Sequence, residues 1–238
     1  MDIDLTFVLD RSSSGSGTNY MISTEMNNML RHFGGRSSGA YVSAPEHSFF
    51  GGKDNSSVLT FITFNHECTN EDVVFEARRI KEIGRDNFKY FFDGATNPAA
   101  GINRALDLAE QRRIMREHNK ETFMPAVIIM FSDGYPDAGS KNGMGYNLTR
   151  QKNVIMKAYA MTAERIKTLE QTGNVLFFVI PVASTGRTPY FDLLKKLTSY
   201  EDRILKGSFS DNIQIIDSAI NKNMAKPDYK CHPLDRFR

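Results

Sequence analysis

The sequence has little of what marks most specialised classes of protein. Its 238 residues include two cysteines, Cys68 and Cys231, and no tryptophan, so too few thiols are present for a disulfide framework. The five histidines are scattered, and no pair has the helical spacing of a zinc site. A formal net charge of +2 gives no general attraction to nucleic acid or to an acidic membrane surface. No apolar run approaches the roughly 18 residues of a membrane-spanning helix.

The first residues also lack a targeting signal. They read MDIDLTFVLD, with acidic residues where a secretory signal carries basic ones and with an apolar run too short for a signal core. We therefore expect a cytoplasmic protein, in which the glycosylation triplets at Asn55 and Asn147 have no meaning. A segment cut from a longer protein would look the same. The length suits one large domain with a sizeable core.

What the chain does contain is an alternation of apolar strands with amphipathic helices. We predict strands over 3–9, 58–64, 126–131 and 174–183, a weaker edge strand over 73–80 and a short strand over 202–208. We predict helices over 20–33, 97–120, 149–173, 189–199 and 210–224. Near-continuous apolar strands that alternate with helices are typical of an α/β domain with a mostly parallel central sheet.

Several side chains have a predicted place in these helices. Asn97 is expected at the N-cap of its helix and Pro98 at the first helical position, which both residues prefer. Ser210 or Asp211 is expected to cap the last helix. The apolar face of the helix over 97–120 is predicted to hold Ala99, Ile102, Leu106 and Ala109. Its solvated face is predicted to hold Glu110, Arg112, Arg113, Arg116 and Glu117.

Two segments do not fit the alternation. Residues 34–56 are rich in glycine and serine and form a longer connection than most loops in a compact domain. We expect an inserted surface loop here, either tolerated as such or in contact with a partner through Phe49 and Phe50. Residues 225–238 are polar with two prolines and are expected to trail along the surface. The remaining chain, 1–224, is predicted to be one domain.

Oxygen-bearing side chains follow the predicted strands. Asp10, Ser12 and Ser14 come directly after the first strand, Thr96 stands just before the helix that starts at 97, and Asp133 follows the strand over 126–131. Ligands of an open parallel sheet bind beyond the carboxyl ends of its strands. Two carboxylates with several hydroxyls, and no histidine or cysteine, suit a hard divalent cation such as Mg²⁺.

These residues resemble a known site. Asp10-x-Ser12-x-Ser14, Thr96 in GATNPAAGINRAL and Asp133 in IIMFSDG are similar, in order and spacing, to the metal-ion-dependent adhesion site of the von Willebrand factor A (vWA) domain. The resemblance covers about residues 2–224 apart from the insertion, and it departs from the family at Ser13, where glycine is usual. It implies a doubly wound, Rossmann-like fold with helices on both faces of the sheet.

The resemblance also implies a function without catalysis. Ser12, Ser14 and Thr96 would bind Mg²⁺ (or Mn²⁺ or Ca²⁺) through hydroxyls, Thr96 directly or through water, while Asp10 and Asp133 would act largely through water. A metal held mostly by neutral oxygens keeps its charge, so it would take an Asp or Glu side chain from a protein partner. Without a signal peptide, the chain is similar to intracellular bacterial members of the family, including those encoded with stress-response genes.

Three segments are expected to surround the metal and contact the partner: Arg11 with the serines beside it, residues 93–97, and the glycine-rich loop 135–147. Tyr135 and Tyr146 of that loop would supply contact area at low entropic cost. The alternative is that loop 135–147 is an inert connection.

The same residues allow three other interpretations. A dinucleotide site is disfavoured because the third glycine after Gly15 and Gly17 would fall at Tyr20, and no P-loop motif is present. A metal-dependent hydrolase or phosphoryl-transfer enzyme would suit Asp10 and Asp133, but Ser12 stands where a second aspartate would be needed. In the third interpretation the fold is the same and its metal is purely structural.

Overall fold

The computed structural model describes residues 4–10, 25, 28, 29, 32, 58–64, 71–76, 96–120, 126–135, 148–183 and 188–224. The strands are β1 (Asp4–Asp10), β2 (Val58–Phe64), β3 (Glu71–Glu76), β4 (Ala126–Ser132) and β5 (Val175–Pro181). The helices are α2 (Pro98–Asn119), α3 (Leu148–Gln171), α4 (Phe191–Leu194) and α5 (Phe209–Met224), with a 3₁₀ turn, η5 (Glu201–Arg203). The α/β class predicted from the alternating pattern is confirmed.

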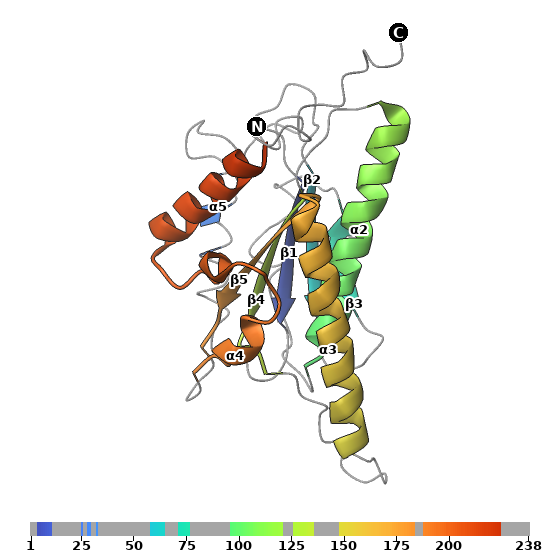
Figure 1. The fold of residues 1–238 in the computed structure, drawn as a ribbon, viewed down its shortest axis with the longest axis vertical. Coiled ribbons are helices and arrows are strands. Elements are labelled where there is room, and N and C mark those ends of the chain that lie inside the picture. The colour runs from blue at the N-terminus through green and yellow to red at the C-terminus, as the bar shows by residue number, and fades with distance from the viewer. Residues whose placement is uncertain are drawn as a thin grey trace.

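The five strands form one sheet in the order β3-β2-β1-β4-β5. β1 pairs in parallel with β2 and β4, and β4 pairs in parallel with β5 (Figure 1). β3 runs antiparallel to β2 at the edge of the sheet. It begins at Glu71, two residues before the start of the edge strand predicted over 73–80. Because β2 lies on one side of β1 and β4 on the other, the strand order reverses beside β1. This is the position at which open α/β sheets bind ligands.

Helices cover both faces of this sheet, which explains why β1 and β4 are buried along their whole length. Successive side chains of a strand point to opposite faces. Phe7 belongs to a cluster that includes Ile216 of α5, whereas Val8 belongs to a cluster with Leu106 of α2 and Ile166 of α3. Figure 1 accordingly shows α5 on one side of the sheet and α2 and α3 on the other.

The last third of the chain corrects two predictions. The strand predicted over 202–208 is wrong, because the chain forms η5 and then makes a single parallel bridge between Ile204 and Val179. The cap predicted for α5 is also wrong, because the helix starts earlier than expected. Ser208 Oγ accepts the Asp211 N–H at 3.3 Å and Asp211 Oδ2 accepts the Ser208 N–H at 3.1 Å. This reciprocal pair makes Ser208 the N-cap.

One arginine of α2 corrects the solvated face predicted for that helix. Arg112 is buried, and its guanidinium donates from Nε to Asp4 Oδ2 at 2.6 Å and from Nη2 to Asp4 Oδ1 at 2.9 Å. Nη1 donates to Thr60 Oγ1 at 3.0 Å. Arg112 follows Ala105 and Ala109 at helical spacing, so it continues the buried stripe and meets the amino end of β1. The four apolar residues predicted for that stripe lie in it.

Other predictions fall outside the described residues. These are the insertion over 34–56, the tail over 225–238 and most of the helix over 20–33. Within that helix, Glu25, Asn28, Met29 and His32 are described, and all four are helical. In the described part of the chain, no helix combines the length and apolar character needed to cross a membrane.

Candidate metal site at the carboxyl edge of the sheet

The two predicted carboxylates lie at the ends of neighbouring strands. Asp10 is the last residue of β1, and Asp133 follows Ser132, the last residue of β4. The Ser132 hydroxyl, which is fully buried, donates a hydrogen bond to Asp10 Oδ2 at 2.8 Å. Asp10 and Asp133 therefore stand at the ends of adjacent strands, beside the point where the strand order reverses.

A tight turn fixes the Asp133 side chain. Asp133 Oδ1 accepts the Tyr135 N–H at 2.9 Å, while the Gly134 N–H donates to Ser132 Oγ at 3.0 Å. Gly134 has φ of 79°, and a Cβ at this position would lie 2.7 Å from Leu194 Cγ. Only glycine fits both the dihedral angle and the space. The turn is also anchored to the segment before α4, because the Asp133 carbonyl accepts the Tyr190 N–H at 2.7 Å.

Two buried oxygens at this edge have no hydrogen-bond donor within the described part of the chain. They are Asp133 Oδ2 and Asn97 Oδ1, on residues that are 5% and 4% exposed. Asn97 occupies the predicted N-cap of α2, yet its side chain makes no capping hydrogen bond. Buried oxygens of this kind are costly unless a donor or a cation satisfies them.

Thr96 reaches the same edge through the start of α2. Gly101, in the first turns of this helix, lies so close to Phe64 that a Cβ on it would be 2.7 Å from Phe64 Cδ1. Phe64 ends β2 and is in register with Asp10. Thr96, which is 3% exposed, precedes α2 by two residues and therefore lies near the carboxyl end of β2. The first turn of α2 has no acidic residue to offset the partial positive charge of its N-terminus.

Of the five predicted ligands, Asp10 ends β1, Asp133 follows β4 and Thr96 precedes α2. Ser12 and Ser14 lie outside the described residues. Among those that are described, no three His, Cys, Asp or Glu side chains lie close enough together to hold a metal ion. The predicted ligand set has two carboxylates and otherwise hydroxyls, so it contains no such group. The donors present, all oxygen and including an unsatisfied carboxylate oxygen, fit a hard divalent cation.

Sequence reasoning missed three residues of this edge. Ser132 had a visible signal, because it is the one polar residue that ends an otherwise apolar strand. Asn97 was assigned a capping role that its side chain does not perform. Tyr190 gave no signal, since it is distant in sequence, yet its ring stacks on Tyr135 with centroids 5.2 Å apart and planes at 27°. Tyr146, the other aromatic residue predicted here, lies outside the described residues.

Comparison with known proteins extends only to the fold. No family model and no curated protein matches the chain. Its structure is similar to proximal thread matrix protein 1 from the mussel byssus, with a TM-score of 0.53, 15% identity, and coverage of 93% of this chain and 46% of that one. It is also similar to the pilus adhesin SpaC from Lactobacillus rhamnosus GG, with a TM-score of 0.53, 9% identity, and coverage of 93% and 30%. The chain thus spans less than half the length of either protein.

Proposed function

We propose that this chain is a doubly wound domain of the vWA type that binds a protein partner through a divalent cation, and that it is not an enzyme. The cation would be Mg²⁺, with Mn²⁺ or Ca²⁺ as alternatives. The partner would offer the carboxylate of an Asp or Glu side chain.

The observation that carries this proposal is the buried Asp133 Oδ2, for which the described residues offer no donor. Asp133 directly follows Ser132, whose hydroxyl donates to Asp10 at the end of β1, the strand beside which the strand order reverses. An anionic oxygen held rigidly in a buried position and left without a donor is suited to a cation or to a water in its coordination shell.

The residues of the edge would have distinct roles. Ser132 donates to the Asp10 carboxylate and would orient it. Asp133 Oδ1 accepts a backbone N–H, which leaves Oδ2 as the oxygen that would face the metal. Thr96, with Ser12 and Ser14, would add neutral hydroxyl oxygens. A bound Mg²⁺ would supply a positive charge with an open coordination position. Because the ligand set would contain few anions, the cation would keep much of its charge, and a carboxylate of the partner would neutralise it.

The stacked rings of Tyr135 and Tyr190 would form the rim on the Asp133 side. Tyr190 is 40% exposed, and both residues are tied to Asp133 through their backbone N–H groups. Rigid aromatic side chains give contact area at low entropic cost, which suits a partner interface. The names of the two structural neighbours, an adhesin and a matrix protein, agree with a binding role, although a likeness at such low identity extends to the fold alone.

The experiment is a comparison of captured partners. The parent chain and Thr96→Ala are immobilised in Mg²⁺ or in chelator, and the proteins they retain from a cell extract are identified. A partner should be retained by the parent in Mg²⁺ and lost in chelator and on Thr96→Ala, but kept by Thr168→Ala, which alters an exposed threonine of α3. Replacing the partner's surface carboxylates one at a time by amides should then identify one that abolishes binding. Binding that persists in chelator, or that ignores Thr96, would place the interface elsewhere.

A further inference from the structure

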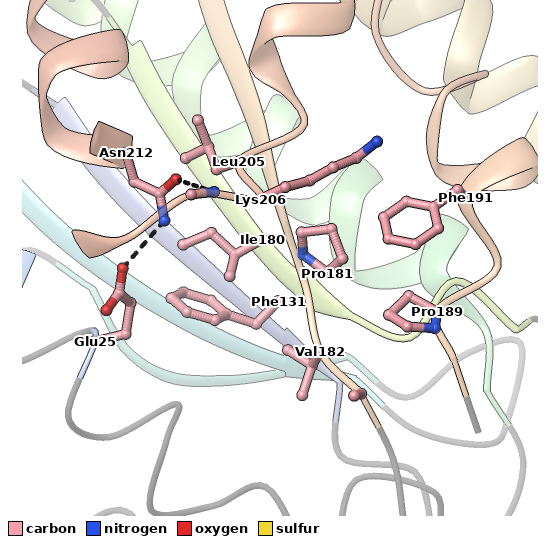
Figure 2. Close-up of a pocket in the computed structure, with 12 residues that line it drawn as sticks. Glu25, Phe131, Ile180, Pro181, Val182, Pro189, Phe191, Leu205, Lys206 and Asn212 are labelled. Atoms are coloured by element: carbon pink, nitrogen blue, oxygen red, sulfur yellow. Dashed lines mark hydrogen bonds between the residues drawn. The ribbon is translucent and has the colours of Figure 1, made fainter. Parts of the chain in front are cut away.

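A pocket of about 320 Å³ lies beside the carboxyl ends of β4 and β5 (Figure 2). It is bounded by these strands, by the segments before α4 and α5, and by Glu25. None of its lining residues belongs to the predicted metal site. Its volume falls at the lower end of the range for small-molecule sites, about 300–1,000 Å³.

The floor of the pocket is apolar. Figure 2 shows Phe131 of β4 and Ile180 of β5 between Glu25 and Lys206, and Val182 and Leu205 also line the pocket. Pro181, at the end of the edge strand β5, has no N–H to donate. The floor therefore suits an apolar body rather than an added β-strand.

One end of the pocket is acidic. Asn212, which is 3% exposed, accepts the Gly207 N–H on Oδ1 at 3.2 Å, and this directs its Nδ2 at Glu25 Oε1. The Nδ2–Oε1 distance is 3.4 Å, longer than an ordinary hydrogen bond of this type. Burial raises the pKa of the Glu25 carboxyl by more than the Asn212 hydrogen bond lowers it. Burial therefore disfavours the ionised Glu25 carboxyl, and a cation beside it would stabilise the carboxylate.

The other end of the pocket is cationic. The Lys206 stem runs away from Glu25, and its Nζ lies 4.4 Å from the centre of the Phe191 ring (Figure 2). A cation–π contact at an exposed site contributes only about 0.5–1 kcal/mol. Within the described part of the chain, the Lys206 ammonium group has the Phe191 ring as its partner and forms no ion pair with a carboxylate. An anionic group at this end would find a better partner in Nζ than the ring does.

We propose that this pocket binds a small dipolar molecule, with a cationic group beside Glu25, an apolar body over Phe131 and Ile180, and an anionic group beside Lys206. The charge complementarity at both ends and the apolar floor between them define the ligand class, that of ω-amino acids and similar zwitterions. This binding is independent of the proposed metal site.

The test uses four probes of equal chain length: ε-aminocaproate, hexylamine, hexanoate and hexanol. Each is titrated into the parent chain in chelator, and binding is followed by calorimetry and by chemical-shift changes. The zwitterion should bind about tenfold more tightly than either singly charged probe, since each charged contact contributes on the order of 1.4 kcal/mol. Hexanol should bind most weakly.

Two isosteric variants assign the ends. Glu25→Gln should remove the preference for ε-aminocaproate over hexanoate and leave its preference over hexylamine, whereas Lys206→Met should do the reverse. Exposed residues away from the pocket provide matched controls, Glu164→Gln and Lys196→Met, which should leave all four affinities unchanged. Circular dichroism checks that each variant is folded.

The proposal is overturned if none of the probes binds, or if hexylamine or hexanoate binds as tightly as the zwitterion. It is equally overturned if Glu25→Gln and Lys206→Met are folded but bind the four probes as the parent does. If Mg²⁺ binding fails while the zwitterion still binds, the metal proposal is wrong and this one holds.

Discussion

The two ends of β1 each carry a buried aspartate, but the protein treats them differently. At the amino end, Asp4 receives two hydrogen bonds from the Arg112 guanidinium, at 2.6 and 2.9 Å. At the carboxyl end, Asp10 accepts a hydrogen bond from the neutral hydroxyl of Ser132, and the adjacent Asp133 retains a buried Oδ2 with no donor within the described part of the chain.

The difference shows how one strand can serve stability at one end and binding at the other. The opposite charges of Asp4 and Arg112 compensate each other inside the fold, so this pair needs no bound ligand. A second buried carboxylate, Glu170, is satisfied in the same way by Arg203 and by the Ser199 N–H. The carboxyl edge instead leaves an anionic oxygen unmatched, which a fold retains at a cost unless a bound group offsets it.

Removing Arg112 should have the largest effect on stability. Arg112→Met leaves Asp4 buried without its cation, and the loss of one partner of a buried ion pair costs about 3–5 kcal/mol of unfolding free energy. Urea denaturation followed by circular dichroism measures this. Arg113→Met, which breaks only an exposed pair with Glu117, should cost about 0.5 kcal/mol or less. The double variant Asp4→Leu/Arg112→Met should recover much of the loss. A double variant as unstable as the single one would show that packing, not charge, is responsible.

Metal binding should have the next largest effect. At a concentration a hundredfold above its Kd, Mg²⁺ should raise the unfolding free energy of the parent by about 2.7 kcal/mol. In chelator the protein should still be folded, because burial of β1 and β4 between helices stabilises the sheet without a metal. Thermal melting with and without chelator checks both statements. An unfolded spectrum in chelator at room temperature would contradict the second.

Gly134→Ala should destabilise the turn at Asp133. The new Cβ would meet Leu194 and the Tyr190 carbonyl at a φ that L-residues rarely adopt, so we expect a cost of about 2 kcal/mol. Mg²⁺ affinity should fall as well, because the Asp133 side chain is oriented by this turn. Calorimetric titration of the folded variant measures the affinity. Unchanged affinity would mean that the turn does not position the ligand.

Ser132→Ala should have the smallest effect on stability. It removes one buried hydrogen bond to Asp10 and the acceptor of the Gly134 N–H, at a cost of about 1 kcal/mol when a water takes the place of the hydroxyl. Ser132→Thr keeps the hydroxyl and serves as the control. Ser132→Ala should lose more Mg²⁺ binding free energy than unfolding free energy, because the Asp10 carboxylate is no longer oriented by the hydroxyl. Equal Mg²⁺ affinities in Ser132→Ala and Ser132→Thr would contradict the positioning role.

The sequence could reveal what depends on local pattern. The buried strands were predicted because β1, β4 and β5 are apolar on both faces. Asp10, Thr96 and Asp133 were proposed as ligands because each stands at a strand or helix boundary, and that assignment stays a prediction. Arg112 could not be assigned, since its partners Asp4 and Thr60 are brought to it only by the folded sheet. The prediction of a strand over 202–208 was wrong, because this segment forms a 3₁₀ turn and a single bridge instead of continuous pairing with β5. Tyr190 required the tertiary structure.

The most direct test of the unmatched carboxylate is a Mg²⁺ titration by calorimetry of the parent, Asp133→Asn and Asp192→Asn. Asp192 is an exposed carboxylate of α4 and serves as the control. We predict one binding site in the parent and in Asp192→Asn, and binding at least about tenfold weaker in Asp133→Asn, because the amide removes the anionic oxygen. Equal affinity and stoichiometry in all three proteins would contradict the assignment of a metal site to this edge.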